Sequence, residues 1–280
     1  MELKIDKEMP ADAPVGVFDS GVGGLTVARE IMRQIPNEKI IYFGDTARVP
    51  YGSKSKETIT KYSRQIVRFL QEQQVKAIVV ACNTASAYAL DEIEKELDIP
   101  MMGVVKPGAK AAVEVTKNGR IGVIGTEGTI GSHIYSTYIN QIDPGIKVTG
   151  KACPLFVPLV EEGLWQDPVT DEIAVRYLSG LVESGIDTLI LGCTHYPLIR
   201  STLGRIVGKG VTLVNPAYET ARELKELLEK KNLLNQKKQE LGTERYCFYV
   251  SDMADKFQTF ANSILTYGIL SAKTIHIENY

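Results

Sequence analysis

Two cysteines of this chain stand in closely similar surroundings. Cys82 follows the apolar run 78–81 and Cys193 follows the apolar run 189–192, and each run is too short to form a helix. Short apolar runs of this kind are typical of strands that are buried on both faces of a parallel sheet. A helix-like pattern follows each cysteine, which puts both thiols at carboxyl ends of strands, where open α/β sheets bind ligands. We therefore predict that both thiols belong to a functional site.

The reactivity of the four cysteines should differ with their positions. At a strand-to-helix turn, backbone N–H groups lower the pKa of a thiol from about 8.5 toward neutrality. We expect this effect at Cys82 and Cys193, so that both thiols exchange protons. His195 lies close after Cys193 and is a candidate partner for it. Cys153 and Cys247 have no acid or base beside them in the sequence, so we expect small, buried, hydrophobic side chains.

Asp19 is a third candidate, because it follows the apolar run 15–18 and precedes Ser20 and a glycine-rich stretch, Gly21-Val22-Gly23-Gly24. A carboxylate at this position is either a helix N-cap or a catalytic group, and the sequence leaves both open. The glycines do not form Gly-x-Gly-x-x-Gly and no Walker lysine follows them. We therefore do not expect ATP or a dinucleotide as ligand.

Three kinds of chemistry are open to the two thiols. Together with His195 they form a Cys-Cys-His set that can bind zinc and leave a fourth position open. They can form a redox disulfide, although neither has a resolving cysteine nearby in the sequence. They can also act on opposite faces of one small ligand, where a thiolate removes a proton from one side and a thiol delivers one from the other. The last arrangement inverts a stereocentre.

The elements that position these residues alternate between strand and helix along the whole chain. This alternation predicts an α/β fold with mainly parallel sheets and right-handed crossovers. We expect strands at 15–18, 40–43, 78–81, 101–105, 120–124, 147–152, 189–192, 211–214, 245–250 and 274–277. We expect helices at 25–34, 59–70, 83–96, 109–117, 133–141, 171–183, 217–231 and 254–265, and another that ends at 207.

Two internal similarities suggest a chain with two pseudo-symmetric halves. The stretch 16–21 resembles the stretch 122–126, and it recurs at nearly the same offset that separates the two cysteine motifs. Turn-forming Lys106-Pro107-Gly108 and Asn215-Pro216 mark the expected crossovers. We predict a first α/β domain of residues 1–106 and 216–280 and a second of residues 107–215, with the active site in the cleft between them. The carboxyl-terminal part should pack back onto the first half.

Two segments read as loops rather than as regular elements. Residues 44–53 are rich in turn formers and long enough for a binding loop. Residues 154–163 contain Pro154 and Pro158, which are unfavourable inside a helix. We therefore expect an irregular loop there that ends in the adjoining carboxylates Glu161 and Glu162.

Composition narrows the function. The net charge is −2 and the basic residues are scattered, so we expect no nucleic-acid partner. No apolar run approaches the roughly 20 residues of a membrane helix, and residues 1–14 lack the apolar core of a secretory signal. Four widely spaced cysteines fit free thiols in a reducing compartment. We expect a cytoplasmic protein without a membrane partner.

Five motifs together resemble the bacterial glutamate racemases of the aspartate/glutamate racemase family. They are Asp19 to Val27, Gly44-Asp45-Thr46 with Pro50-Tyr51-Gly52, Ala81 to Ser86, Gly122 to Thr129, and Leu191 to Leu198, and the resemblance spans about Val15 to Ser251. It implies a cofactor-independent interconversion of L- and D-glutamate that supplies D-glutamate for peptidoglycan. It also implies that neither a metal nor another cofactor is used, and we expect a homodimer.

The resemblance implies a role for each matching residue. Cys82 would take the α-proton from D-glutamate with the help of Asp19, and Cys193 would take it from L-glutamate with the help of His195 and Glu161. The substrate would be held by Asp19, Ser20, Pro50, Tyr51, Gly52, Asn83, Thr84, Thr126, Thr194 and His195. Three alternatives stay open: a racemase for aspartate or another amino acid, a zinc-dependent hydrolase, and a non-catalytic amino-acid-binding protein.

Overall fold

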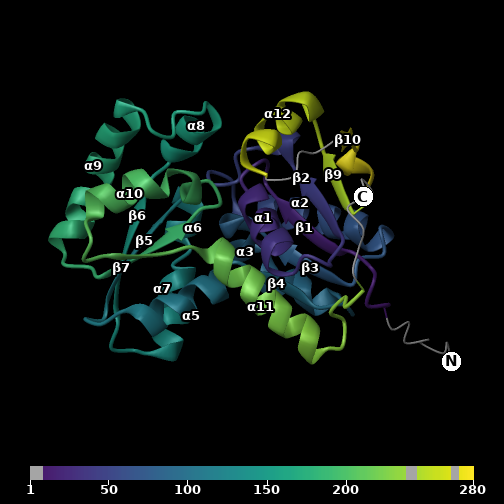
Figure 1. The fold of residues 1–280 in the computed structure, drawn as a ribbon, viewed down its shortest axis with the longest axis horizontal. Coiled ribbons are helices and arrows are strands. Elements are labelled where there is room, and N and C mark those ends of the chain that lie inside the picture. The colour runs from purple at the N-terminus through teal and green to yellow at the C-terminus, as the bar shows by residue number, and fades with distance from the viewer. Residues whose placement is uncertain (1–8, 238–244, 266–270) are drawn as a thin grey trace.

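The computed structural model describes residues 9–237, 245–265 and 271–280. Residues 1–8, which belong to the stretch where we expect no secretory signal, lie outside the described residues. Two lobes lie side by side in Figure 1, each built on a sheet with helices on its faces. The predicted α/β fold class is confirmed.

The sheet of the first lobe has the strand order β10-β9-β2-β1-β3-β4, and all of its pairs are parallel. Its strands are β1 (Val15–Asp19), β2 (Ile40–Gly44), β3 (Ala77–Val80), β4 (Met101–Gly103), β9 (Tyr246–Val250) and β10 (Ala272–Thr274). Because β9 pairs with β2, the carboxyl-terminal part of the chain extends the first sheet, as expected. The strand expected at 274–277 is wrong in its bounds, since residues 277–279 form a 3₁₀ turn whose Ile277 is buried in the core.

The sheet of the second lobe has the order β6-β5-β7-β8 and is also parallel. Its strands are β5 (Arg120–Gly125), β6 (Lys147–Ala152), β7 (Thr188–Gly192) and β8 (Thr212–Val214). This order repeats the β2-β1-β3-β4 order of the first lobe, so β3 and β7 occupy equivalent positions. Both strands are buried along their whole length, as the apolar runs predicted. The domain boundaries at 106/107 and 215/216 stay a prediction.

The helices cover the faces of the two sheets (Figure 1). Those of the first sheet include α1 (Leu25–Gln34), α2 (Lys56–Glu72), α3 (Asn83–Tyr88), α4 (Leu90–Ile93) and α12 (Ala254–Ile264). The helices between β4 and β9 are α5 (Val105–Val115), α6 (Glu127–Gly131), α7 (Ile134–Ile142), α8 (Phe156–Glu161), α9 (Pro168–Glu183), α10 (Arg200–Val207) and α11 (Pro216–Lys230). Helix α11 packs on both α1 and α5 and so joins the two lobes.

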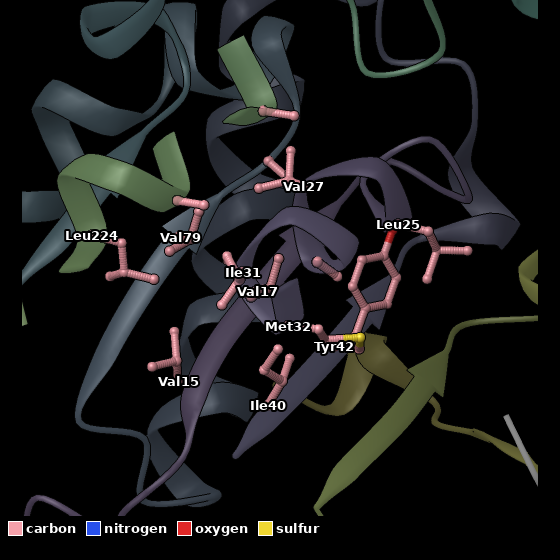
Figure 2. Packing of buried hydrophobic residues seen from close by; sticks show 14 of the residues in the cluster. Val15, Val17, Leu25, Val27, Ile31, Met32, Ile40, Tyr42, Val79 and Leu224 are labelled. Atoms are coloured by element: carbon pink, nitrogen blue, oxygen red, sulfur yellow. The ribbon is translucent and has the colours of Figure 1, made fainter. Parts of the chain in front are cut away.

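Packing of α1 and α11 on the first sheet forms one continuous core, part of which Figure 2 shows. Leu25, Ile31 and Met32 of α1 lie on one helix face and are buried against Val17 and Tyr42 of β1 and β2. Burial of a leucine or isoleucine side chain of this kind stabilises a fold by about 1.5–3 kcal/mol. This core therefore holds the carboxyl ends of β1 and β3 in place.

Helix α5 begins earlier than expected, at Val105, and it includes Pro107 and Gly108, where we expected a break. The prediction is wrong because Pro107 lies in the first helical turn, whose N–H groups have no partner within the helix in any case. A Cβ atom on Gly108 would lie 3.0 Å from Cγ of Pro216. The glycine thus permits a close approach of α5 to α11.

The same reasoning corrects the segment 154–163. It is not the irregular loop we expected, because residues Phe156–Glu161 form the short helix α8. Pro158 again lies in the first turn, where its missing N–H costs nothing. The helix ends at Glu161, and this end sets the direction in which its carboxylate points.

Candidate active site

A cavity of about 380 Å³ lies between the lobes, at the carboxyl ends of β1, β3, β5 and β7. This volume is in the range of pockets that enclose small molecules. The predicted site residues that line the cavity are Ser20, Pro50, Tyr51, Gly52, Cys82, Asn83, Thr84, Thr126, Glu161, Cys193, Thr194 and His195. Residues that sequence reasoning missed also line it, namely Gly21, Val49, Ser53, Glu127, Pro154, Val157 and Pro158.

The two thiols occupy equivalent places in the two sheets. Cys82 lies two residues after the end of β3 and caps α3, and its Sγ accepts a hydrogen bond from the N–H of Ala85 at 3.5 Å. Cys193 directly follows β7. Each is only 6% exposed, and both line the same cavity. One small ligand in this cavity is therefore within reach of a thiol from each lobe.

Burial dominates the protonation of Cys82. Burial and the nearby charge of Asp19 raise the pKa of this thiol to about 12. The hydrogen bond from the Ala85 N–H lowers the pKa, but by less. The prediction that a helix start lowers this pKa toward neutrality is wrong for Cys82, because one long N–H···S contact does not offset desolvation. Cys82 therefore carries its proton at neutral pH.

Asp19 is fully buried below the cavity wall. Its carboxylate accepts hydrogen bonds from the N–H of Gly21 at 3.0 Å and from the hydroxyl of Thr194 at 3.5 Å. Burial raises its pKa, against the opposing effects of His195 and backbone N–H groups. The N-cap of α1 is Gly24, which makes no side-chain cap bond. Asp19 is therefore not the N-cap of α1, and its catalytic role stays a prediction.

Cys193 stands at one end of a hydrogen-bonded chain of three side chains. The Sγ atom of Cys193 lies 3.7 Å from Nδ1 of His195, and Nε2 of His195 lies 2.9 Å from Oε1 of Glu161. Burial lowers the pKa of His195, but its contacts with Cys193 and Glu161 outweigh that effect and raise it to about 10. Burial likewise opposes ionisation of Glu161, yet His195 brings the pKa of this carboxyl below its usual value. His195 and Glu161 therefore form an ion pair beside the thiol, whereas Glu162 is exposed.

The glycine-rich stretch serves contact between the lobes. A Cβ atom on Gly23 would lie 2.3 Å from Oγ1 of Thr194 and 2.5 Å from the ring of His195, which leaves no room for a side chain. The hydroxyl of Thr26 donates to the carbonyl of Thr194 at 2.9 Å. The sequence alone does not explain why a glycine is needed at position 23, because Thr194 and His195, which it contacts, are distant along the chain.

The segment 44–53 is held rigidly next to the cavity. The hydroxyl of Tyr51 donates to the carboxylate of Asp45, which also pairs with Arg48 at 2.8 Å. The carbonyl of Gly52 accepts from the N–H of Gly128 at 2.8 Å, and a Cβ atom on Gly52 would lie 2.7 Å from Cβ of Thr126. The Tyr51 hydroxyl is thus already engaged by Asp45, while the residues 49–53 line the cavity.

Apolar residues on the cavity wall were missed for a definable reason. Val157 and Pro158 belong to α8, whose helical form we did not predict, and Pro154 precedes it. No local signal in this stretch indicates that it covers a cavity. Glu127 lies in the first turn of α6, beside Thr126, whose motif was recognised.

Within residues 9–237, 245–265 and 271–280, no three His, Cys, Asp or Glu side chains gather closely enough to hold a metal ion. No helix in the described part of the chain is both long and apolar enough to cross a bilayer.

The fold and site define a class of two-lobed α/β proteins in which each lobe presents one thiol to a shared cavity. A family model described as Asp/Glu/Hydantoin racemase matches residues 16–224. The glutamate racemase of Geobacter metallireducens is 52% identical over 251 residues, which cover 90% of this chain and 92% of that protein. The chain belongs to the Asp/Glu/Hydantoin racemase family.

Solved structures agree with the sequence comparisons. The glutamate racemase of Francisella tularensis, in complex with D-glutamate, matches with a TM-score of 0.89 and 39% identity over 96% of this chain and all of that chain (100%). Glutamate racemase isoform RacE1 of Bacillus anthracis matches with a TM-score of 0.89 and 42% identity over 94% of this chain and 97% of that one. The two-lobed architecture is therefore shared with these enzymes.

Proposed function

We propose that this protein interconverts L- and D-glutamate without a cofactor, with Cys82 and Cys193 as acid and base on opposite faces of the α-carbon. The observation that carries the proposal is the equivalent placement of the two thiols on two lobes around one cavity. Inversion of a stereocentre needs one group to remove a proton and another to deliver one from the opposite side. The relatives and solved neighbours named above as glutamate racemases support glutamate as the substrate.

The protonation of the site residues favours one direction of the first turnover. Cys82 keeps its proton because the pKa of its thiol is about 12. His195, with a pKa of about 10, is a cation at neutral pH, and its ring lies 3.7 Å from the sulfur of Cys193. In our proposal Cys193 therefore takes the α-proton of L-glutamate, and Cys82 delivers its own proton to the other face.

The reverse direction starts from the enzyme form that this turnover leaves behind. Cys82 is then the thiolate and takes the α-proton of D-glutamate, and Cys193 returns a proton to give L-glutamate. Asp19 is the acid/base partner that we assign to Cys82, because its charge acts on that thiol. Glu161 holds His195 in place and keeps it charged.

Removal of the α-proton places negative charge on the α-carbon and its carboxylate, which fixed hydrogen-bond donors must stabilise. Hydroxyl groups from both lobes lie together on the cavity wall for this purpose. The Oγ1 atoms of Thr84 and Thr126 are 2.8 Å apart, and the buried hydroxyl of Thr129 lies 3.2 Å from the first and 3.1 Å from the second. We assign Ser20, Asn83, Thr84, Thr126 and Thr194 to the α-amino and α-carboxylate groups and the Pro50-Tyr51-Gly52 segment to the side-chain carboxylate.

In a bacterial cell the product of this reaction would supply D-glutamate for peptidoglycan. We place the protein in the cytoplasm and propose that it works as a homodimer. Sedimentation of the purified protein over a range of concentrations tests the assembly, and a monomer at all concentrations would contradict it.

A polarimetric or coupled assay with both enantiomers of glutamate and of aspartate, in the absence of metal and pyridoxal phosphate, tests the activity. We expect turnover of both glutamate enantiomers, with an equilibrium ratio of one, and much slower turnover of aspartate. Turnover of aspartate at equal or higher kcat/KM would move the assignment to another racemase of the family. Absence of turnover with all four substrates would overturn it.

A further inference from the structure

One hydrogen bond between the lobes ends on a residue of the cavity wall. The hydroxyl of Tyr135 donates to Oδ1 of Asn83 at 2.7 Å. Asn83 begins α3 of the first lobe, directly after Cys82, and Tyr135 lies on α7 of the second lobe (Figure 1). Both side chains are buried, at 4% and 3% exposure. Asn83 lines the cavity, whereas Tyr135 stands behind it.

The direction of this bond determines which end of the amide is free. An asparagine amide has one acceptor oxygen and an NH₂ group with two donors. Within the described part of the chain, Oδ1 of Asn83 is the only hydrogen-bond partner of the Tyr135 hydroxyl. If the amide were turned around, the buried hydroxyl hydrogen would have no acceptor, which is unfavourable. The tyrosine therefore holds the oxygen and leaves the NH₂ group for the cavity.

We propose that Tyr135 is a positioning residue that orients the Asn83 amide so that its Nδ2 donors bind the α-carboxylate of the substrate. The α-carboxylate is the fitting group, because Asn83 adjoins Cys82, which acts at the α-carbon in the proposed function on which this inference rests. A carboxylate accepts hydrogen bonds and cannot donate them once ionised, so an amide in the opposite orientation would repel it. Burial also keeps the pKa of the Tyr135 phenol above its usual value, so the phenol remains a donor.

The same helix provides a matched control. Tyr138 lies one turn further along α7, and its hydroxyl donates at 3.2 Å to Asp91, which also belongs to the first lobe. Tyr138 is half-buried and does not line the cavity. Replacement of either tyrosine by phenylalanine removes one hydrogen bond between the lobes and keeps the ring. Only the change at position 135 frees the Asn83 amide.

The first experiment compares Tyr135→Phe and Tyr138→Phe with the unaltered enzyme in the glutamate assay. We expect Tyr135→Phe to lower kcat/KM by about 10-fold or more for both enantiomers, and Tyr138→Phe to stay within twofold. Thermal unfolding of each variant reports whether it is folded. Unchanged kcat/KM in a folded Tyr135→Phe variant, or an equal loss in Tyr138→Phe, would overturn the inference.

A double-mutant cycle separates positioning from a purely structural role. If Tyr135 acts through Asn83, the variant Asn83→Ala/Tyr135→Phe will be no slower than Asn83→Ala. Losses that multiply in the double variant would contradict the inference, because they would mean that Tyr135 acts independently of the amide.

Asn83→Asp gives a test that does not depend on the folding of Tyr135→Phe. The aspartate still accepts from Tyr135 but presents a negative oxygen to the cavity in place of the donors. We expect it to raise KM for both enantiomers by more than Asn83→Ala does. A KM equal to or below that of Asn83→Ala would overturn the inference. Absence of glutamate turnover by the unaltered enzyme would instead overturn the proposed function.

Discussion

Nε2 of His195 lies 2.9 Å from Oε1 of Glu161, and this contact joins the last residue of α8 to the loop after β7. Together with the contact to Cys193, this pair raises the pKa of the histidine to about 10. It thereby places a positive charge next to Cys193 over the whole physiological pH range. The contact has consequences for stability as well as for catalysis.

The stability of the protein should fall with rising pH because of this pair. The pKa of His195 is raised from 6.5 to about 10 on folding, so its contribution is fully present below about pH 6.5 and is lost as the pH rises through 10. Glu161→Gln removes the partner carboxylate, and we expect a smaller decrease in the free energy of unfolding between these pH values. Urea unfolding at several pH values measures this change in the free energy of unfolding. Glu162→Gln, which changes the exposed neighbour, is the control. If both variants reduce the pH dependence of the free energy of unfolding equally, the prediction is contradicted.

Replacement of either active-site thiol should abolish racemisation. We expect Cys82→Ser and Cys193→Ser each to lower kcat by about 10²- to 10⁴-fold, since a hydroxyl is a far weaker acid than a thiol. Cys247→Ser, outside the cavity, should retain kcat. Initial rates with L- and D-glutamate check this. If a folded Cys82→Ser variant retains most of its activity, the assignment of the acid/base pair is incorrect.

Solvent isotope should enter the product but not the remaining substrate. In the proposed mechanism, Cys193 removes the hydrogen of L-glutamate on one face while Cys82 delivers a solvent-derived deuteron on the other in deuterated water. We expect deuterated D-glutamate and largely protiated L-glutamate early in the reaction. Mass spectrometry of the separated enantiomers at low conversion measures both. Transfer of the substrate's own α-hydrogen into the product would point to a single base.

Exhaustive chelation should leave the activity unchanged, because two thiols and a histidine suffice for the proposed proton transfers. The assay is run after dialysis against a chelator, with added zinc as the second arm. Loss of turnover that zinc restores would support the alternative in which Cys82, Cys193 and His195 bind a metal.

The contact between the lobes at Gly23 should tolerate no side chain. In Gly23→Ala the new Cβ atom would lie 2.3 Å from Oγ1 of Thr194, so the loop that carries Cys193 and His195 must shift. We expect a loss of about 1–3 kcal/mol in stability and a clear fall in kcat/KM. Gly180→Ala in α9 is the control, because its Cβ atom meets nothing within 4 Å and alanine favours a helix. Wild-type activity in Gly23→Ala would show that the lobes are not in close contact there.

Some features of this protein follow from the sequence alone, because their signals are local. The apolar runs before Cys82 and Cys193 identify β3 and β7, since only a strand covered on both faces is apolar at every position. The alternation of strands and helices predicts the parallel α/β class. The repeated motifs predict the equivalent placement of the two thiols, which the matching strand orders bear out.

Other features depend on residues that are distant along the chain. The two prolines near Glu161 suggested a loop, because first-turn and mid-helix prolines look alike until the helix start is known. The pKa of Cys82 was misjudged, since desolvation depends on how completely both lobes cover the thiol. Nothing in the sequence indicates the role of Tyr135, because only the arrangement of the two lobes brings its hydroxyl to Asn83. Local sequence patterns thus determined which elements carry the candidate site residues. Burial and contact between the lobes decided the protonation of the Cys82 thiol and the orientation of the Asn83 amide.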